Sequence, residues 1–195
     1  MTDKPQLKKA DSEELRLFYD WMKEQFHPGE LKWLSHIENM CDCGVYCAYG
    51  LWRNGELIAY ALLGNTKDQR VHLLDYFAVL PQYQDAGWGS RCLQMLSEEL
   101  PGDAILFEVE DPDYAPDEEE RAHFQRRIRF YDRNGCEHMK VKLYLYGFDY
   151  AIMQLPQRKH LSDAQAHEAL MEIYHTFSPP DMYAKHVKFR EDSYA

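Results

Sequence analysis

The chain has 195 residues, of which 45% are apolar, a length and composition that suit one domain with a sizeable hydrophobic core. Its formal net charge of -11 argues against a nucleic-acid partner, because a polyanion would be repelled overall. The sequence shows neither a transmembrane run nor the apolar segment of a signal peptide, so we expect a cytoplasmic protein with no membrane partner.

The first part of the chain is predicted to form a short strand, two helices and three strands. Leu15, Phe18 and Met22 recur at helical spacing, which predicts an apolar stripe on the first helix. Asn54-Gly55 is a strong signal for a tight turn between two strands. The predicted elements are a strand at 6–9, helices at 12–26 and 29–40, and strands at 45–52, 57–63 and 70–80.

Three cysteines, Cys41, Cys43 and Cys47, form a C-x-C-x-x-x-C cluster that resembles part of a zinc site. Structural zinc usually needs four closely spaced ligands, and no second ligand cluster accompanies these three. His167-Glu168 does not begin a metalloprotease motif either, since Met171 stands where the second histidine is needed. We therefore predict no metal site and expect reduced cysteines that pack as small apolar residues.

The most informative stretch runs from the strand at 70–80 into the helix that follows it. Alternating residues predict a strand that ends at Pro81, because proline cannot extend a strand ladder. Gly87 and Gly89 follow in a turn, where glycine allows backbone conformations that are closed to bulkier residues. N–H groups of the turn and of the next helix can then converge on an anion. The segment lacks the features of the two common phosphate loops, so it predicts an anion-binding turn without naming a nucleotide.

The second part of the chain is predicted to continue with a strand, a helix, two more strands and a last helix. Phe124, Ile128 and Tyr131 fall at positions i, i+4 and i+7 of one helix, which Asn134-Gly135 closes. The other predicted elements are strands at 104–110, 137–146 and 149–155, a helix at 162–177 with Ser162 as its N-cap, and an irregular tail at 181–195 after Pro179-Pro180.

Acidic residues crowd the segment at 108–120, which reads EVEDPDYAPDEEE. One interpretation is a solvated loop and a helix start, where the carboxylates at 117–120 suit the helix dipole. The other interpretation is the recruitment of a cationic amine substrate. Both interpretations stay open at this point.

Two motifs in these segments resemble those of the GNAT superfamily of N-acetyltransferases. The first is Q/R-x-x-G-x-G/A after a strand that ends in V-x-P, which here reads VLPQYQDAGWG from Val79 to Gly89. The second is a helix that ends in Y-x-x-x-G, which here runs from Tyr131 to Gly135. The resemblance covers residues 44–155, the spacing between the two motifs agrees with it, and the chain is identified as a member of this superfamily.

The resemblance implies an α/β (α+β) GNAT fold, with a mixed, mostly antiparallel twisted sheet flanked by helices. Its parallel central strands, at 70–80 and 104–110, would part to admit the pantetheine arm of acetyl-CoA. We expect the acetyltransferase domain to span residues 1–155. A C-terminal helix and an irregular tail, residues 156–195, would pack on the same domain.

The resemblance also implies that acetyl-CoA is the co-substrate. Backbone groups at the end of the strand would contact the pantetheine, and the turn would hold the pyrophosphate. The pantetheine residues are Phe77, Ala78 and Val79, and the pyrophosphate residues are Gln84, Asp85, Ala86, Gly87, Trp88, Gly89 and Ser90.

The implied reaction is transfer of an acetyl group to a primary amine of a small molecule, a peptide or a protein, by direct attack on the thioester. An alkyl amine has a pKa near ~10, so a base must take its proton. Glu108 resembles the glutamate that does so in the peptide N-terminal acetyltransferase branch, Asp75 is the competitor, and Glu110 could act through water. Tyr131 matches the tyrosine of the family and would donate a proton to the CoA thiolate.

The sequence departs from the family at two positions near the tyrosine. Phe124 stands where relatives often carry asparagine, and Arg127 replaces a small residue. These departures affect the acceptor contacts more than CoA binding. The alternative function is a non-catalytic CoA-binding or interaction module with the same fold, and the chain could form a homodimer.

Overall fold

The structure is a computed structural model that describes residues 4–190 of the chain. The described residues form two compact units. The first contains the chain up to Gly64 together with Leu74–Leu100, and the second contains Asn65–Leu73 and the chain from Pro101 onward.

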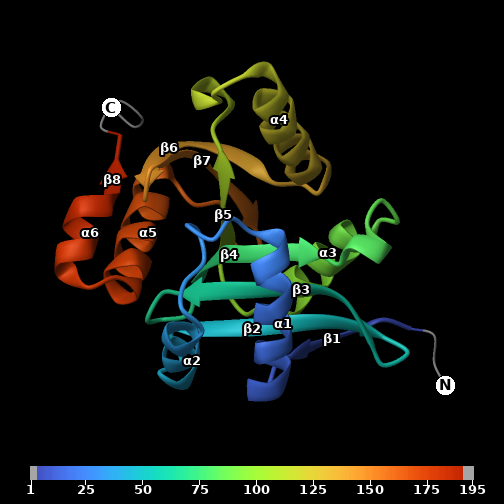
Figure 1. Cartoon of the computed structure of the whole chain (residues 1–195). Helices are drawn as coiled ribbons and strands as arrows, with labels where there is room; N and C mark the ends of the chain where they lie inside the picture. Colours follow the sequence, from blue (N-terminus) through green and yellow to red (C-terminus); the bar gives the residue numbers. More distant parts are fainter. Residues whose placement is uncertain (1–3, 191–195) are drawn as a thin grey trace. The chain divides into compact units, whose positions relative to one another are not determined.

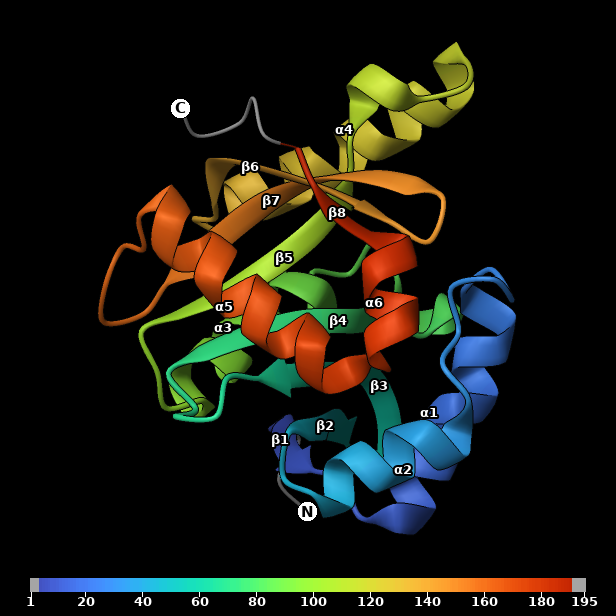
Figure 2. The same ribbon diagram turned by 90° about the vertical axis from the view of Figure 1, so that its left-hand side faces the viewer.

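The first unit contains four strands in the order β1-β2-β3-β4 (Figure 1). The pairs β1–β2 and β2–β3 are antiparallel. Helices α1 and α2 lie on one face of these strands and α3 lies on the other (Figures 1 and 2). The bounds are β1 Gln6–Lys9, α1 Ser12–Gln25, α2 Leu34–Asp42, β2 Tyr46–Arg53, β3 Glu56–Asn65, β4 Val71–Val79 and α3 Trp88–Glu99, with Asn65 and the first part of β4 belonging to the second unit.

Local sequence explains where α1 begins and which face it buries. The Asp11 carboxylate accepts hydrogen bonds from the N–H groups of Glu13 and Glu14, both at 2.9 Å, and the Glu14 carboxylate accepts one from the Asp11 N–H. This reciprocal arrangement satisfies donors that a helix start leaves open. The predicted apolar stripe of α1 is buried, and the ring of Phe18 stacks on that of Tyr60 with centroids 5.6 Å apart. The stripe therefore anchors α1 to the strands of its own unit.

The second unit contains four strands in the order β5-β7-β6-β8, and all three neighbouring pairs are antiparallel. Helix α4 lies on one face of these strands and α5 on the other, while α6 leads directly into β8 (Figures 1 and 2). The bounds are β5 Ala104–Glu110, α4 Glu118–Arg133, β6 Glu137–Leu145, β7 Phe148–Pro156, α5 Asp163–Phe177, α6 Pro180–His186 and β8 Val187–Phe189. Ser162 caps α5 through the Gln165 N–H, as predicted.

The helix predicted at 29–40 was placed too early, since α2 spans Leu34–Asp42. The backbone before it bonds to tyrosine side chains instead of forming helical hydrogen bonds. The Tyr76 hydroxyl donates to the Glu30 carbonyl at 2.6 Å and accepts from the Lys32 N–H at 3.1 Å. Tyr19 donates to the Lys32 carbonyl at 3.2 Å. The local sequence pattern does not reveal tertiary contacts of this kind, so the predicted helix began several residues too early.

The irregular tail predicted at 181–195 was also wrong for the residues that the structure describes. Pro180 occupies the first turn of α6, where its missing N–H has no intrahelical partner to lose. The strand β8 then pairs with β6 from Leu145 to Leu143. Pairing with a distant strand orders this segment, and a local pattern does not reveal such pairing. Residues 191–195 of the predicted tail lie outside the described part of the chain.

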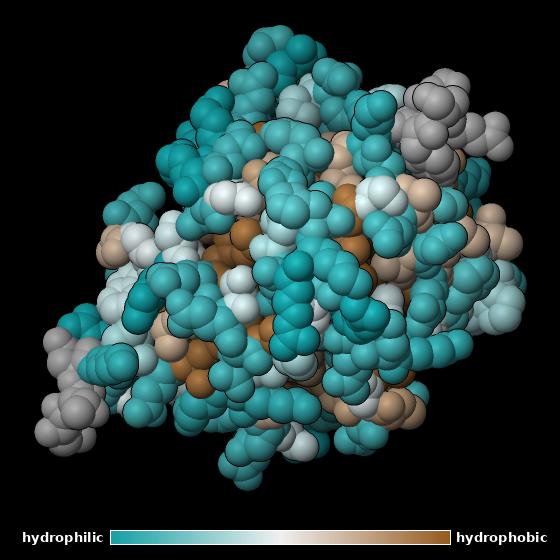
Figure 3. Space-filling model, turned by 180° about the vertical axis from the view of Figure 1, so that it is seen from behind, coloured by the Kyte–Doolittle hydropathy of each residue, from teal (hydrophilic) through white to brown (hydrophobic). Residues whose placement is uncertain are grey.

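The predicted division at residue 155 stays a prediction. Along the described chain, no helix is long and apolar enough to cross a membrane. Within residues 4–190, no three histidine, cysteine, aspartate or glutamate side chains are grouped so that they could hold a metal ion. The face in Figure 3 is mostly hydrophilic, with only small apolar areas between polar side chains.

Candidate functional site

The turn between β4 and α3 has the backbone geometry that its glycines predict. A short 3-10 turn at Pro81–Tyr83 follows the strand, and the chain then passes through left-handed conformations at Asp85, with φ 59°, and at Gly87, with φ 79°. Gly87 is the N-cap of α3 and offers no side chain to the open N–H groups of the first helical turn. Those groups and the positive end of the helix dipole are therefore available to an anion. Gly89 lies within α3 itself.

Two glutamine side chains fix this turn to the end of β4. The carbonyl oxygen of Val79 accepts hydrogen bonds from Gln25 Nε2 at 3.0 Å and from Gln84 Nε2 at 3.1 Å. Gln25 is held in turn by the hydroxyl of Tyr60, which donates to its Oε1 at 2.8 Å. The glutamine of the sequence motif therefore serves as a clamp on the strand end. A pantetheine contact at Val79 would have to use another group or displace one of these amides.

Two arginines lie close to this turn in the first unit. The guanidinium carbon of Arg53 lies 5.4 Å from the ring centre of Trp88, the first residue of α3. Arg91 lies one turn further along α3 and donates to Gln94 at 3.0 Å. Neither arginine belongs to the glycine motif, so the sequence pattern did not single them out. Arg53 thus places a positive charge beside the first residue of α3.

All ten predicted CoA-binding residues belong to the first unit and follow one another closely along the chain. Phe77, Ala78 and Val79 at the end of β4 are half-buried. The residues of the turn, 84–90, are exposed or half-buried. These ten residues therefore form one accessible segment, which consists of the end of β4 and the turn after it.

Tyr131 belongs to the second unit and is buried on α4, with 6% of its surface exposed. Its ring centre lies 4.8 Å from that of Phe107 on β5. Burial raises the pKa of the phenol, and a hydrogen bond and positive charge from Arg127 partly oppose that rise. The phenol is therefore a proton donor that stays protonated at neutral pH.

Arg127 lies one helical turn before Tyr131 and joins it to a carboxylate. Its guanidinium forms an ion pair with Glu110 at the end of β5, and its positive charge opposes the rise in the pKa of the Tyr131 phenol. Glu110, Arg127 and Tyr131 therefore form one polar chain. The sequence marked Arg127 only as a departure from the family, although its i, i+4 spacing from Tyr131 was a usable signal.

The three candidate bases lie in different surroundings. Glu108 and Glu110 both lie on β5, two residues apart and half-buried, so they share a face of the strand. Asp75 belongs to the first unit, where its carboxylate accepts from Lys32 Nζ at 2.7 Å and from the Tyr46 hydroxyl. A lysine and a tyrosine therefore already occupy the carboxylate oxygens that an amine would have to reach.

A family model described as acetyltransferase (GNAT) family matches residues 12–135, more than half of the chain. Among solved structures, an acetyltransferase from the GNAT family of Bacteroides thetaiotaomicron is 23% identical, covers 88% of this chain and 96% of its own, and has a TM-score of 0.69. The ribosomal-protein-S18-alanine N-acetyltransferase of Escherichia coli is 20% identical over 82% of this chain and 97% of its own, with a TM-score of 0.57.

The spermidine N-acetyltransferase of Vibrio cholerae, solved in complex with CoA and spermine, is 13% identical over 81% of this chain and 98% of its own, with a TM-score of 0.57. No curated protein matches the sequence. The likeness to solved structures confirms the predicted fold class, a mixed, mostly antiparallel sheet with flanking helices.

Proposed function

The chain belongs to the acetyltransferase (GNAT) family, whose members use acetyl-CoA, and from this premise we propose that it acetylates a primary amine by direct attack on the thioester. The amine nitrogen forms a bond to the carbonyl carbon, the carbon–sulfur bond breaks, and CoA leaves as a thiolate. Protein groups must take one proton from the amine and supply one to the sulfur.

The observation that carries this proposal is the open N-terminus of α3. Helices α1, α4 and α5 have a capping side chain at their start, whereas α3 starts at Gly87 without one, as α2 does at Trp33. Of α2 and α3, only α3 follows a turn with a left-handed glycine at its N-cap. The free N–H groups of such a helix start, which follows a glycine turn, suit the pyrophosphate of CoA. We assign the pyrophosphate to residues 84–90, with Arg53 adding positive charge, and the pantetheine to Phe77–Val79.

The two proton transfers are assigned to residues of the second unit. We assign removal of the amine proton to Glu108, because Asp75 is engaged by Lys32 and Tyr46 and Glu110 forms an ion pair with Arg127. Glu110 acting through water is the second choice. We assign protonation of the thiolate to Tyr131, whose raised pKa keeps the phenol protonated at neutral pH. Arg127 positions that phenol and is itself held by Glu110.

No single group of the site identifies the acceptor amine. Solved proteins of similar fold are described as acting on spermidine and on the alanine of a ribosomal protein, which are an alkyl polyamine and a peptide amine. Both are amines, and both remain open for this chain. The alternative function is a CoA-binding module without acceptor chemistry, which would bind acetyl-CoA and leave it intact.

A panel of alkyl amines, polyamines and N-terminal peptides, offered with acetyl-CoA, separates these possibilities. We expect amine-dependent release of free CoA thiol with at least one class, and loss of that release in Tyr131→Phe. Binding of acetyl-CoA measured by calorimetry on the same protein gives the second readout. Tight binding without thiol release from any class would reject the enzymatic proposal and favour the binding module.

A further inference from the structure

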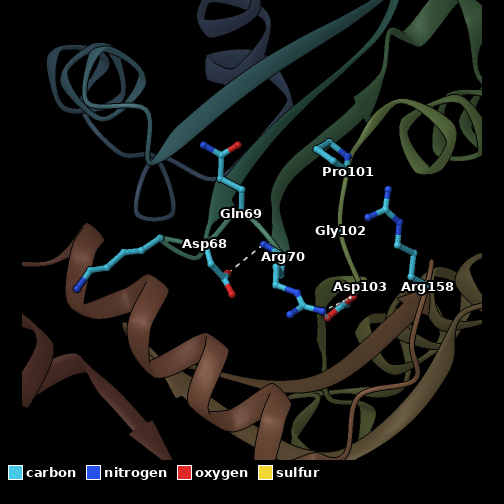
Figure 4. Close-up of a pocket in the computed structure, with 8 residues that line it drawn as sticks. Asp68, Gln69, Arg70, Pro101, Gly102, Asp103 and Arg158 are labelled. Carbon is cyan, nitrogen blue, oxygen red and sulfur yellow. Dashed lines mark hydrogen bonds and ion pairs between the residues drawn. The ribbon is translucent and has the colours of Figure 1, made fainter.

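The second unit contains a polar pocket of about 390 Å³ that lies away from the turn and from Tyr131 along the chain. Three loops form it: the β3–β4 loop at 66–70, the α3–β5 loop at 101–103, and the segment after β7 at 157–159. Figure 4 shows the segment of Gly102 and Asp103 running between the side chains of Arg70 and Arg158. The volume is within the range of pockets that hold small ligands.

Backbone hydrogen bonds fix the walls of this pocket. The carbonyl oxygen of Asp103 accepts three successive N–H groups, from Gln157 at 2.8 Å, Arg158 at 3.0 Å and Lys159 at 3.2 Å. The Asp103 N–H in turn donates to the Arg70 carbonyl at 2.6 Å. One residue thus joins all three loops, so the backbone positions from which their side chains extend are fixed around the pocket.

The floor near Gly102 is equally constrained. A Cβ at Gly102 would lie 2.7 Å from the Arg70 carbonyl oxygen and 3.1 Å from Nε2 of His72, so only glycine fits. His72 is buried, and its Nε2 lies 2.6 Å from the Pro101 carbonyl oxygen. The loop at 101–103 is therefore packed tightly on the start of β4.

The two carboxylates of the pocket already have partners. Asp103 accepts from Arg70 Nη2 at 2.8 Å and pairs with Lys159 at 3.6 Å. Asp68 accepts from the Thr66 hydroxyl at 2.7 Å and from the Arg70 N–H at 3.1 Å, which lowers its pKa. Both carboxylates hold the loops in place and leave little negative charge free to oppose an anion.

Two cations of the pocket are free by comparison. Within residues 4–190, the side chains of Arg158 and Lys67 have no hydrogen bond or ion pair, although both line the pocket. Among the residues that line the pocket, Lys67, Arg70 and Arg158 are positive and Asp68 and Asp103 are negative, a local excess of +1 in a protein whose net charge is -11. The Glu172 carboxylate, which does not line the pocket, accepts from the Lys67 N–H at 2.6 Å. An excess of this sign, on fixed loops, is complementary to a multivalent anion.

We propose that this pocket is a second ligand site that binds a small anion carrying a phosphoryl group, with Arg158 as its main contact and Lys67 as its second. The planar guanidinium of Arg158 donates two parallel hydrogen bonds to two phosphoryl oxygens, and the ammonium of Lys67 supplies a further positive charge. None of the residues that line the pocket belongs to the proposed pyrophosphate turn at 84–90.

Inorganic pyrophosphate and inorganic phosphate, titrated into the full chain by calorimetry with acetyl-CoA present at saturation, test this proposal. Saturating acetyl-CoA occupies the other anion site. We expect saturable binding of pyrophosphate, an affinity lower by about 10-fold or more in Arg158→Ala, and a smaller loss in Arg158→Lys, which keeps the charge but not the fork. Lys67→Ala should weaken binding as well.

Arg133→Ala is the matched control, because this arginine is exposed in the same unit and does not line the pocket. It should leave pyrophosphate affinity unchanged. Equal affinity in wild type and Arg158→Ala, or no saturable binding of either anion, overturns the proposal. Acetyl-CoA affinity, measured for the same variants, should not change, so this result and the test of acetyl transfer are independent.

Discussion

The two candidate parts of the machinery are built in opposite ways. The turn at 84–90 in the first unit is exposed or half-buried, and its chemistry comes from backbone N–H groups that Gly87 leaves open. The chain of Glu110, Arg127 and Tyr131 in the second unit depends on side chains, and Tyr131 is buried. A backbone site should fail when a conformation is forbidden, whereas a side-chain site should fail when one functional group is removed.

Gly87→Val is the strongest test of the backbone part. Valine resists the left-handed conformation that Gly87 adopts at φ 79°, so the N–H groups at the start of α3 should turn away from the anion. We expect loss of measurable acetyl-CoA binding by calorimetry, with a far-ultraviolet circular dichroism spectrum like that of wild type.

Gly55→Val is the matched control for that variant. Gly55 lies in the same unit, has φ 83°, and likewise has no atom near the position of a Cβ. It should cause a similar loss of stability while acetyl-CoA affinity is kept. Wild-type affinity in a folded Gly87→Val protein would remove the turn from the proposed site.

Tyr131→Phe removes one hydroxyl from the side-chain part and leaves the ring in place. If the phenol protonates the thiolate, kcat should fall by roughly 10²-fold while acetyl-CoA affinity stays the same. Tyr174→Phe is the control, since Tyr174 is another buried tyrosine of the second unit. Unchanged turnover in Tyr131→Phe would make this residue a packing residue only.

Arg127→Met tests whether the polar chain positions and tunes the phenol. Arg127 opposes the rise that burial causes in the pKa of Tyr131, so its removal should raise that pKa further and move the alkaline limb of the kcat profile to higher pH. We expect kcat to fall by about 10-fold, less than for Tyr131→Phe.

Arg127→Lys should retain part of the activity that Arg127→Met loses, because lysine keeps the positive charge but lacks the paired N–H donors of the guanidinium. Arg126→Met, an exposed change on the same helix, should leave kcat and its pH profile unaltered. A fall in kcat without any shift of the pH profile would point to a structural role for Arg127 instead.

His72 gives a smaller effect, on stability. Burial lowers the pKa of the imidazole more than its hydrogen bond to the Pro101 carbonyl raises it. The folded state therefore favours neutral histidine, so its contribution is present above the unfolded pKa of about 6.5 and is lost as the pH falls. Urea unfolding on both sides of this pH should show a larger loss of stability on acidification for wild type than for His72→Gln.

The sequence predicted what local patterns determine and missed what distant contacts determine. The bounds of β5, the cap at Ser162 and the glycine turn before α3 all follow from neighbouring residues, and the structure confirms them. The strand β8 exists because β6 pairs with it, and no nearby residue announces that pairing. In the same way, the charge of Asp75 suggested a base, while its partner Lys32 lies 43 positions away in the chain.

The acidic segment at 108–120 should give the smallest effect, and the structure reduces the number of carboxylates that can attract an amine. Asp111 is buried and pairs with Lys142 at 2.7 Å, and Asp117 caps α4 through the Glu120 N–H. Asp117 is exposed but engaged as this cap, and the other exposed carboxylates of the segment are Asp113 and Glu118–Glu120. They alone could attract a cationic acceptor from solution.

Changing these four exposed residues to their amides tests recruitment of the acceptor. If the segment attracts a cationic amine, its KM should rise by a few-fold at low salt and depend less on ionic strength, since screening then has less charge to act on. A solvated helix start predicts instead an unchanged KM and a small loss of stability, about 0.3 to 1 kcal/mol for each carboxylate in the first turn. Amine KM measured at low and high salt distinguishes the two accounts, and parallel salt curves for wild type and variant would reject recruitment.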